Sequence, residues 1–335
     1  MRPRDLRAAI RLCIETGQPL LITGAPGTGK TELAKQEAIE IAREEGGAVQ
    51  IVHPVCDDPS DYKGLGFPSL DRTYAEFLAY GNLKLMIEAP KLLIIILDDV
   101  GQAMPSVQAA LMQLVRERSV NGKKISNNVR FVLCTNRKGD KAAVTGLIEP
   151  LKSRCTIVAL DVHADDWRQW AAGAGMPPEL IAFSKLCPDL LHKFVPTSDV
   201  TNSPCPRGWG AVGVLQNKGV PAAIEYEIYG GTCGEEFAAK YCAFLKTYRE
   251  MPNPELWIKD PEKELPENES TLYALTSALA YMANAKNVGQ IFKVAMRLDA
   301  EFSTFLVFSM VQRQKSLASN AGMGLWAKKF APYLT

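Results

Sequence analysis

Apolar residues in the first half of the chain fall in short runs that alternate with amphipathic stretches. These runs predict buried strands at 19–23, 48–52, 92–97, 129–134 and 155–160. The run from Leu92 to Leu97 is apolar throughout, which is typical of a central strand covered on both faces. Helical spacing at 30–45 and 105–118 completes a β–α–β alternation. The pattern therefore predicts an α/β domain at 1–160, built on a central parallel sheet of five strands.

The strand pattern ends after Leu160, and the later apolar positions have the spacing of helices. Helical segments are expected at 164–195, 207–249 and 271–312, separated by proline-containing breaks at 196–206 and 251–270. Trp167 and Trp170 begin the first segment, where we expect them to seat the helical part. We therefore predict an all-helical domain at 161–250 and a helical C-terminal extension at 251–335. The apolar stripe of the extension is expected to pack against that domain; it contains Leu272, Leu275, Leu279 and Met282.

Two loops of the first half are candidate contact sites for a partner. Asn121-Gly122 predicts a tight hairpin, because both central residues of such a turn need a positive φ. Lys123 and Lys124 beside it are expected to form a solvated tip, with contact to an acidic partner as the alternative. In the segment after the second strand, Tyr62 and Phe67 are candidates for gripping a partner, with a mobile surface loop as the alternative.

Composition narrows the class of protein. Of the 335 residues, 47% are hydrophobic and 22% are charged, which is typical of a globular chain and not of a disordered one. The net charge of +1 argues against a protein that mainly binds the nucleic-acid backbone. The eight cysteines form no C-x-x-C pair, so we expect neither a zinc nor a disulfide scaffold, and we expect a cytoplasmic location. The aliphatic runs are too short for a membrane span.

The turn after the first strand carries the strongest chemical signal in the chain. It fits the pattern G-x-x-x-x-G-K-[ST], with the residues Gly24, Ala25, Pro26, Gly27, Thr28, Gly29, Lys30 and Thr31. Glycines let the backbone curl so that several N–H groups face one phosphate, and the helix that follows adds its positive end. Lys30 is expected to reach the β- and γ-phosphates of a nucleotide, and the Thr31 hydroxyl is expected to bind Mg²⁺.

Two acidic residues follow the third strand, at the carboxyl edge of the predicted sheet. Because ligands of open α/β sheets bind at this edge, we expect Asp98 to lie beside the phosphate loop and hold the metal. Asp99 is then expected to face the attacking water as its base or orienting group. Together with the loop, these carboxylates predict a site for MgATP.

The order of these motifs resembles the AAA+ ATPases, and within them the MoxR-like branch, over about residues 1–250. Cys134-Thr135-Asn136-Arg137 at the end of the fourth strand resembles the segment called sensor 1, which implies that Asn136 positions water near the γ-phosphate. Ser153-Arg154 resembles the position of the arginine finger, so Arg154 is implied to act on the nucleotide of a neighbouring subunit. Pro206-Arg207-Gly208 resembles sensor 2 in the helical lid, with Arg207 on the γ-phosphate of its own subunit.

The resemblance implies an ATP- and Mg²⁺-dependent ATPase that assembles as a ring, expected to be a hexamer, and remodels a protein client. A protein with a von Willebrand factor A domain is the kind of partner that it implies. The chain departs from the family at Asp99, where glutamate is usual, and the shorter side chain leaves slow hydrolysis open. Two alternatives therefore stay open, which are a nucleotide-gated assembly switch and a DNA-directed motor or clamp loader.

Overall fold

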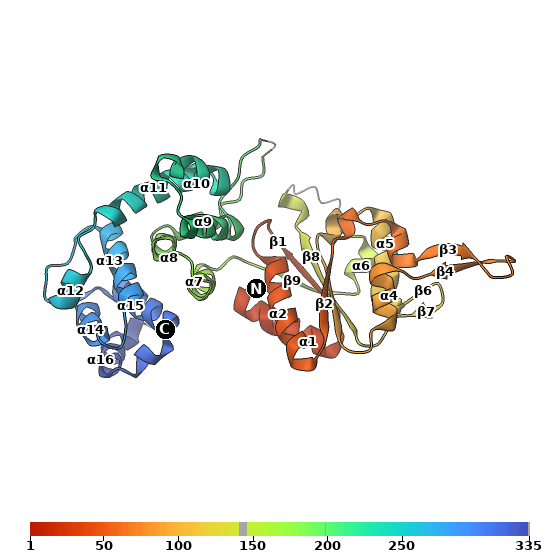
Figure 1. Ribbon diagram of the computed structural model, residues 1–335, viewed down its shortest axis with the longest axis horizontal. Helices are drawn as coiled ribbons and strands as arrows, with labels where there is room; N and C mark the ends of the chain where they lie inside the picture. The colour runs from red at the N-terminus through yellow and green to blue at the C-terminus, as the bar shows by residue number, and fades with distance from the viewer. Residues whose placement is uncertain (141–145, 198, 334–335) are drawn as a thin grey trace. The chain divides into compact units, whose positions relative to one another are not determined.

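The computed structural model describes residues 1–140, 146–197 and 199–333. The chain divides into two compact units, at 1–162 and 163–335 (Figure 1). Among the described residues, none of the helices combines the length and the apolar character needed to cross a membrane. The boundary between the two units coincides with the change from alternating to purely helical spacing in the sequence.

The first unit is built on a five-stranded parallel sheet in the order β2-β5-β8-β1-β9. Its strands match the five predicted apolar runs to within two residues; they are β1 (Leu20–Gly24), β2 (Ala48–Val52), β5 (Leu93–Leu97), β8 (Val129–Asn136) and β9 (Thr156–Ala159). The pairs β2–β5, β5–β8, β8–β1 and β1–β9 are all parallel. The predicted fold class, an α/β sheet followed by helices, is confirmed.

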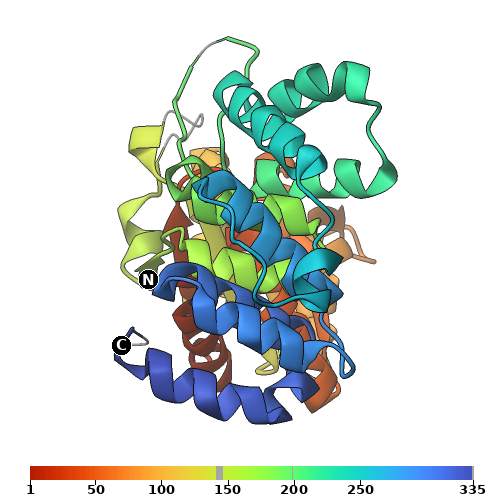
Figure 2. The same ribbon diagram turned by 90° about the vertical axis from the view of Figure 1, so that its left-hand side faces the viewer.

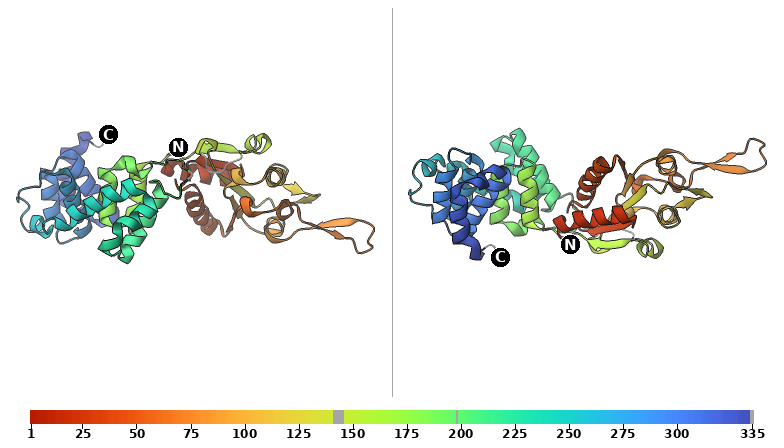
Figure 3. Two further views of the ribbon diagram at one scale, coloured as in Figure 1. Left: turned by 90° about the horizontal axis from the view of Figure 1, so that it is seen from above. Right: turned by 90° about the horizontal axis from the view of Figure 1, so that it is seen from below.

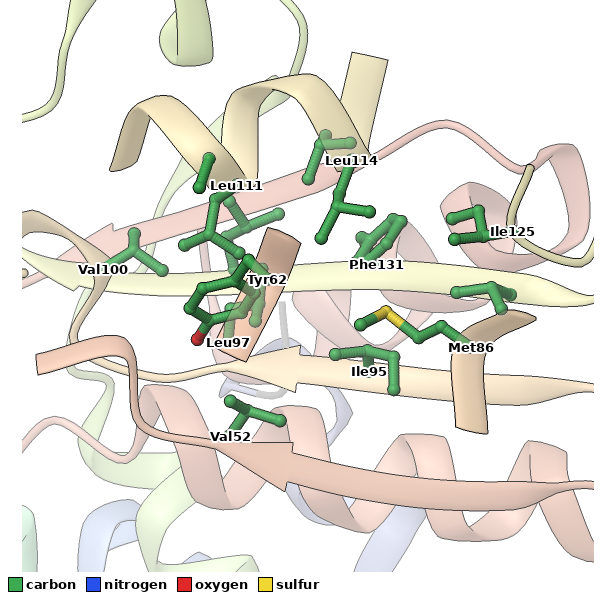
Figure 4. Packing of buried hydrophobic residues seen from close by; sticks show 14 of the residues in the cluster. Val52, Tyr62, Met86, Ile95, Leu97, Val100, Leu111, Leu114, Ile125 and Phe131 are labelled. Carbon is green, nitrogen blue, oxygen red and sulfur yellow. The ribbon is translucent and has the colours of Figure 1, made fainter. Parts of the chain in front are cut away.

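Helices cover both faces of this sheet. Successive residues of a buried strand point to opposite sides, so each central strand contributes to two cores. Ile94 and Ile96 of β5 face α1 (Pro3–Thr16) and α2 (Lys30–Glu45). Ile95 and Leu97 belong to the other core, which is covered by α3 (Pro59–Lys63), α4 (Gly81–Glu88), α5 (Pro105–Glu117) and α6 (Glu149–Lys152). In Figure 4, Leu111 and Leu114 of α5 point toward the strand residues. Helix α1 has no counterpart among the predicted elements.

Two antiparallel hairpins extend from the end of the first unit that carries α4. The strands β3 (Leu65–Pro68) and β4 (Ala75–Leu78) form the longer hairpin, which reaches well beyond the helices of this unit (Figure 3). The shorter hairpin, β6 (Ser119–Val120) and β7 (Lys123–Lys124), turns at Asn121 and Gly122, with φ of 46° and 78° as predicted. Asn121 Nδ2 donates to Lys63 O at 2.7 Å, and Lys123 Nζ donates to Phe77 O at 3.0 Å. The two hairpins therefore brace each other.

The expectation that Tyr62 grips a partner is wrong. Its ring is 1% exposed and lies in the core beneath α5, and its hydroxyl donates to Asp57 Oδ2 (Figure 4). A reciprocal capping box between Asp58 and Asp61 starts the short helix α3 and turns Tyr62 inward. Phe67 is 48% exposed on the longer hairpin, so that residue keeps the accessibility it was expected to have.

The second unit consists of helices and their connections (Figure 2). Its α-helices are α7 (Ala164–Gly173), α8 (Pro178–Leu186), α9 (Pro206–Lys218), α10 (Glu225–Cys233), α11 (Glu235–Glu250), α12 (Glu255–Lys259), α13 (Glu269–Met282), α14 (Val288–Arg297), α15 (Ala300–Arg313) and α16 (Ala321–Phe330). Short 3-10 helices in the chain lie at Pro54–Cys56, Val100–Gln102, Lys138–Asp140, Pro188–Leu191, Ala222–Ile224, Lys315–Ser319 and Ala331–Tyr333.

An aromatic cluster holds the first helices of the second unit together. Trp167 of α7 lies edge-on to Trp209 of α9, with ring centroids 5.4 Å apart, and Phe183 of α8 stacks on Trp209 at the same distance. Helix α13 packs on α8, where Ser277 Oγ donates to Pro178 O at 2.7 Å. The described residues of 163–335 form one compact unit, which includes both the predicted helical domain and the predicted C-terminal extension.

The core beneath α5 predicts which shortened side chains destabilise the first unit. Leu114 is fully buried, so Leu114→Ala removes packed methyl groups and should lower the free energy of unfolding by about 2–5 kcal/mol. Leu85 of α4 is 52% exposed, and Leu85→Ala should change it by less than about 0.5 kcal/mol. Urea unfolding followed by circular dichroism measures both, and equal losses for the two variants would contradict this packing.

Candidate nucleotide-binding site

The loop between β1 and α2 has the backbone of a phosphate cradle. Gly27 and Gly29 have φ of 74° and 93°, a left-handed conformation that glycine adopts without strain. Thr28 Oγ1 donates to Ala25 O at 2.9 Å and closes the loop on itself. Helix α2 begins directly at Lys30, and its N-cap residue is Gly29, which has no side chain to cap the first turn. The start of a helix that follows such a glycine loop favours an anion, because its N–H groups and its dipole point toward the loop.

The Lys30 ammonium lies inside this loop. The residue is 7% exposed, and its Nζ donates to Gly24 O at 3.1 Å, to Ala25 O at 2.9 Å and to Asn136 Oδ1 at 2.7 Å. These three partners are two backbone carbonyls and an amide, none of which carries a formal charge. Phosphate oxygens can replace them with charge-assisted hydrogen bonds, which are stronger.

Thr31 and Asp98 form the part of the site that fits a metal ion. Thr31 Oγ1 donates to Asp98 Oδ1 at 2.7 Å. Asp98 Oδ1 also accepts from the backbone N–H of Asp99 at 3.0 Å. Mg²⁺ prefers oxygen ligands and commonly takes only one or two from the protein, with the rest from phosphate and water. A hydroxyl and a carboxylate next to a phosphate loop fit that preference.

Asp99 and Asn136 meet on the other side of Lys30. Asn136 is the last residue of β8 and lies opposite Gly24 in the register of the sheet. Its Nδ2 donates to Asp99 Oδ1 at 3.4 Å, while its Oδ1 accepts from Lys30. Asp99 has φ 55° and ψ 33°, a left-handed conformation that aspartate tolerates better than most side chains. The amide of Asn136 thus links the lysine to this carboxylate.

Two residues beside the site were not predicted from the sequence. His53 follows β2, and its Nδ1 lies 4.0 Å from Asp98 Oδ2. Its position at the carboxyl end of a predicted strand was the available signal. Cys134 is buried in β8 near Asp98 and Lys30, and burial raises the pKa of its thiol. A thiol that stays protonated adds no negative charge against an incoming phosphate.

Arg154 lies at the opposite edge of the sheet from the phosphate loop. It precedes β9, whose first residue Thr156 pairs with Leu20 at the start of β1, whereas the loop follows the end of β1. The whole of β1, which is five residues or about 16 Å long, therefore lies between the level of Arg154 and the level of the phosphate loop. The Arg154 guanidinium donates to Pro150 O at 2.6 Å and to Ser153 Oγ at 2.7 Å.

Arg207 lies in the first turn of α9, in the helical unit, with its side chain exposed. It is adjacent to Gly208 and close to Trp209, which the aromatic cluster fixes. The structure therefore brings Lys30, Thr31, Asp98, Asp99 and Asn136 together, whereas Arg207 belongs to α9 of the helical unit.

Comparisons with known proteins return matches among solved structures alone. No model of a known protein family matches the chain, and no curated protein matches it. A RuvB mutant from Thermotoga maritima is 14% identical, with 86% of this chain and 83% of that chain covered and a TM-score of 0.41. DnaA from Aquifex aeolicus bound to AMPPCP is 16% identical, with 99% and 94% covered and a TM-score of 0.35. NtrX from Brucella abortus is 16% identical, with 94% and 67% covered and a TM-score of 0.38.

The cradle predicts a specific loss when its cation is removed. Lys30→Ala takes the ammonium away from the phosphates, and a hydrogen bond to a charged group contributes about 1.5–3 kcal/mol. Binding of a fluorescent ATP analogue with Mg²⁺ should therefore weaken at least about tenfold. Lys35→Ala is the matched control, because Lys35 is exposed on the same helix. Equal affinities for the Lys30 variant and the parent protein would contradict the site.

Proposed function

We propose that this chain is an ATP-hydrolysing AAA+ protein of the MoxR-like branch that works as a ring, expected to be a hexamer, and remodels a protein client. One observation carries the proposal. Lys30, Thr31, Asp98, Asp99 and Asn136 converge at the carboxyl edge of the sheet, and Arg154 lies at the edge that faces away from them.

Each converging residue has a role in this proposal that follows from its chemistry. Backbone N–H groups of the loop and Lys30 bind the phosphates of ATP, and Thr31 and Asp98 hold Mg²⁺, which neutralises charge on the phosphates. Asp99 accepts a hydrogen bond from the attacking water and orients it. Asn136 holds the Asp99 carboxylate through its Nδ2, so that the water and the γ-phosphate are kept in line.

A second copy of the chain is needed to complete the site in this proposal. Charge develops on the transferred phosphoryl group, and an arginine supplied by a neighbour contributes about 10³–10⁵ in rate. Arg154 is separated from its own loop by more than the length of β1, so its own nucleotide is out of reach. A ring places the Arg154 edge of one copy at the loop of the next. Arg207 is proposed to contact the γ-phosphate from the helical unit.

The longer hairpin is the proposed contact for the client. It carries six exposed large apolar side chains, which are Leu65, Phe67, Leu70, Tyr74, Phe77 and Leu78. Exposed apolar clusters of this kind mark interaction surfaces in soluble proteins. Lys123 braces the hairpin through Phe77 O and is proposed to support it rather than to touch a partner. A protein with a von Willebrand factor A domain is the first kind of partner to test.

Arg154 provides the sharpest test of the shared site. Arg154→Ala should leave ATP binding unchanged and lower turnover by at least about 10³-fold, because the transition state loses its external positive charge. Mixing it with Lys30→Ala should restore turnover, since one variant then offers an intact loop and the other an intact arginine. Lys152→Ala is the control, because it removes a positive charge close to Arg154 in the sequence. Normal turnover in Arg154→Ala alone would refute the assignment.

Asp99 favours a second candidate function, a switch in which ATP binding alone drives assembly. Aspartate is one methylene shorter than the usual glutamate, and an error of about 1 Å in positioning can cost about 10²-fold in rate. The left-handed backbone of Asp99 is the compensating feature in the present proposal, because it changes the direction of the side chain.

The two functions predict different results for Asp99 variants. For an ATPase, Asp99→Asn should keep ATP binding and lower turnover by at least about 10²-fold, since an amide cannot take a proton from water. Steady-state phosphate release measures this. If the parent protein releases phosphate no faster than Asp99→Asn, and Asp99→Glu releases it faster than both, the assembly switch is the better description.

A further inference from the structure

Gln108 is a fully buried polar side chain that the proposed chemistry does not use. It lies in the first half of α5 with 0% exposure, surrounded by the apolar core beneath that helix. Both ends of its amide are engaged. Nε2 donates to Ala103 O and to Gly146 O, each at 3.0 Å, and Oε1 accepts from Ile148 N at 3.0 Å. One side chain therefore binds two backbone segments, one at Ala103 and the other at Gly146 and Ile148.

The first of these segments is the turn that carries Asp99. Asp99 O accepts from Gln102 N at 2.9 Å, and Val100 O accepts from Ala103 N at 3.4 Å. Val100 and Ala103 are both fully buried. The turn from Asp99 to Ala103 is thus closed by its own hydrogen bonds, and Gln108 holds its far end.

The second segment leads into the helix that carries Arg154. Ile148 is the residue before α6, and its carbonyl accepts from Leu151 N at 3.0 Å. Leu151 is fully buried, and its carbonyl accepts from Arg154 N at 3.3 Å. The guanidinium of Arg154 folds back onto Pro150 O. A shift of Ile148 therefore moves the base of the arginine side chain with it.

We propose that Gln108 is a positioning residue that joins the Arg154 segment to the Asp99 turn, so that the arginine offered to a neighbour is held by the sender's own active-site turn. This inference rests on the proposed function, in which Arg154 acts on the next copy. An apolar side chain of the same length would fill the same volume beside Leu111, but it would form none of the three hydrogen bonds. Packing alone therefore does not account for an amide at this position.

The test separates the sender of the arginine from the holder of the nucleotide. Arg154→Ala serves as the holder, with an intact loop and no finger. Lys30→Ala serves as the sender, with an intact finger and no nucleotide of its own. Turnover of the mixture then reports the arginine of the sender, and sedimentation velocity reports whether the two variants assemble.

Gln108→Met added to the sender should lower turnover of the mixture about 10- to 100-fold while assembly and ATP binding by the holder stay the same. Gln108→Glu is the second sender variant, because it keeps an acceptor for Ile148 N–H and loses both donors; it should also lower turnover. Ser126→Ala is the matched control, since it removes two partly buried hydrogen bonds in the same unit, the one donated to Ala89 O and the one accepted from Asn128 N. It should change nothing.

The outcomes distinguish a failure of the Gln108 inference from a failure of the proposed function. Full turnover with either folded Gln108 variant in the sender overturns the inference and leaves the proposed function standing. An equal loss with Ser126→Ala also overturns it, because the effect is then general to the core. If the mixture without any Gln108 change is inactive, the shared site is wrong and the inference falls with it.

Discussion

The register of the parallel sheet is the constraint on which the site depends. Gly24 lies opposite Asn136, and Leu97, the residue before Asp98, lies opposite Leu133. This alignment brings the ends of β1, β5 and β8 to one edge, where Lys30, Asp98 and Asn136 meet within hydrogen-bonding distance of their partners. A shift of one residue in any of these strands would turn its side chains to the other face and separate the groups.

The same sheet separates what must act together in the proposed reaction. Because β9 runs parallel to β1, Arg154, two residues before the start of β9, and the loop after β1 lie at opposite edges. In the proposed reaction one copy therefore cannot bring Arg154 to its own phosphate loop, so the proposal requires assembly. Within each copy, Gln108 bonds to the segment that follows Asp99 and to the segment that precedes α6.

Much of this arrangement could be predicted from the sequence, because it depends on local signals. The five apolar runs, the glycine loop and the Asn-Gly turn each specify their own backbone. Tyr62 was misplaced because its burial depends on α5, which is distant in sequence, and on a capping box in a segment that reads as a loop. The longer hairpin was missed since its strands lack a buried face and so lack alternation. Gln108 has no local pattern at all, and its role follows from its bonds to Gly146 and Ile148, which are distant in sequence, as well as to nearby Ala103.

The most direct measurement of the central claim is turnover per chain as a function of protein concentration, with sedimentation velocity on the same samples in ATP and Mg²⁺. The account predicts that nucleotide drives self-association and that turnover per chain rises in step with the assembled fraction, because each site takes its arginine from another copy. A protein that stays monomeric at every concentration and hydrolyses ATP at a constant rate per chain would contradict it.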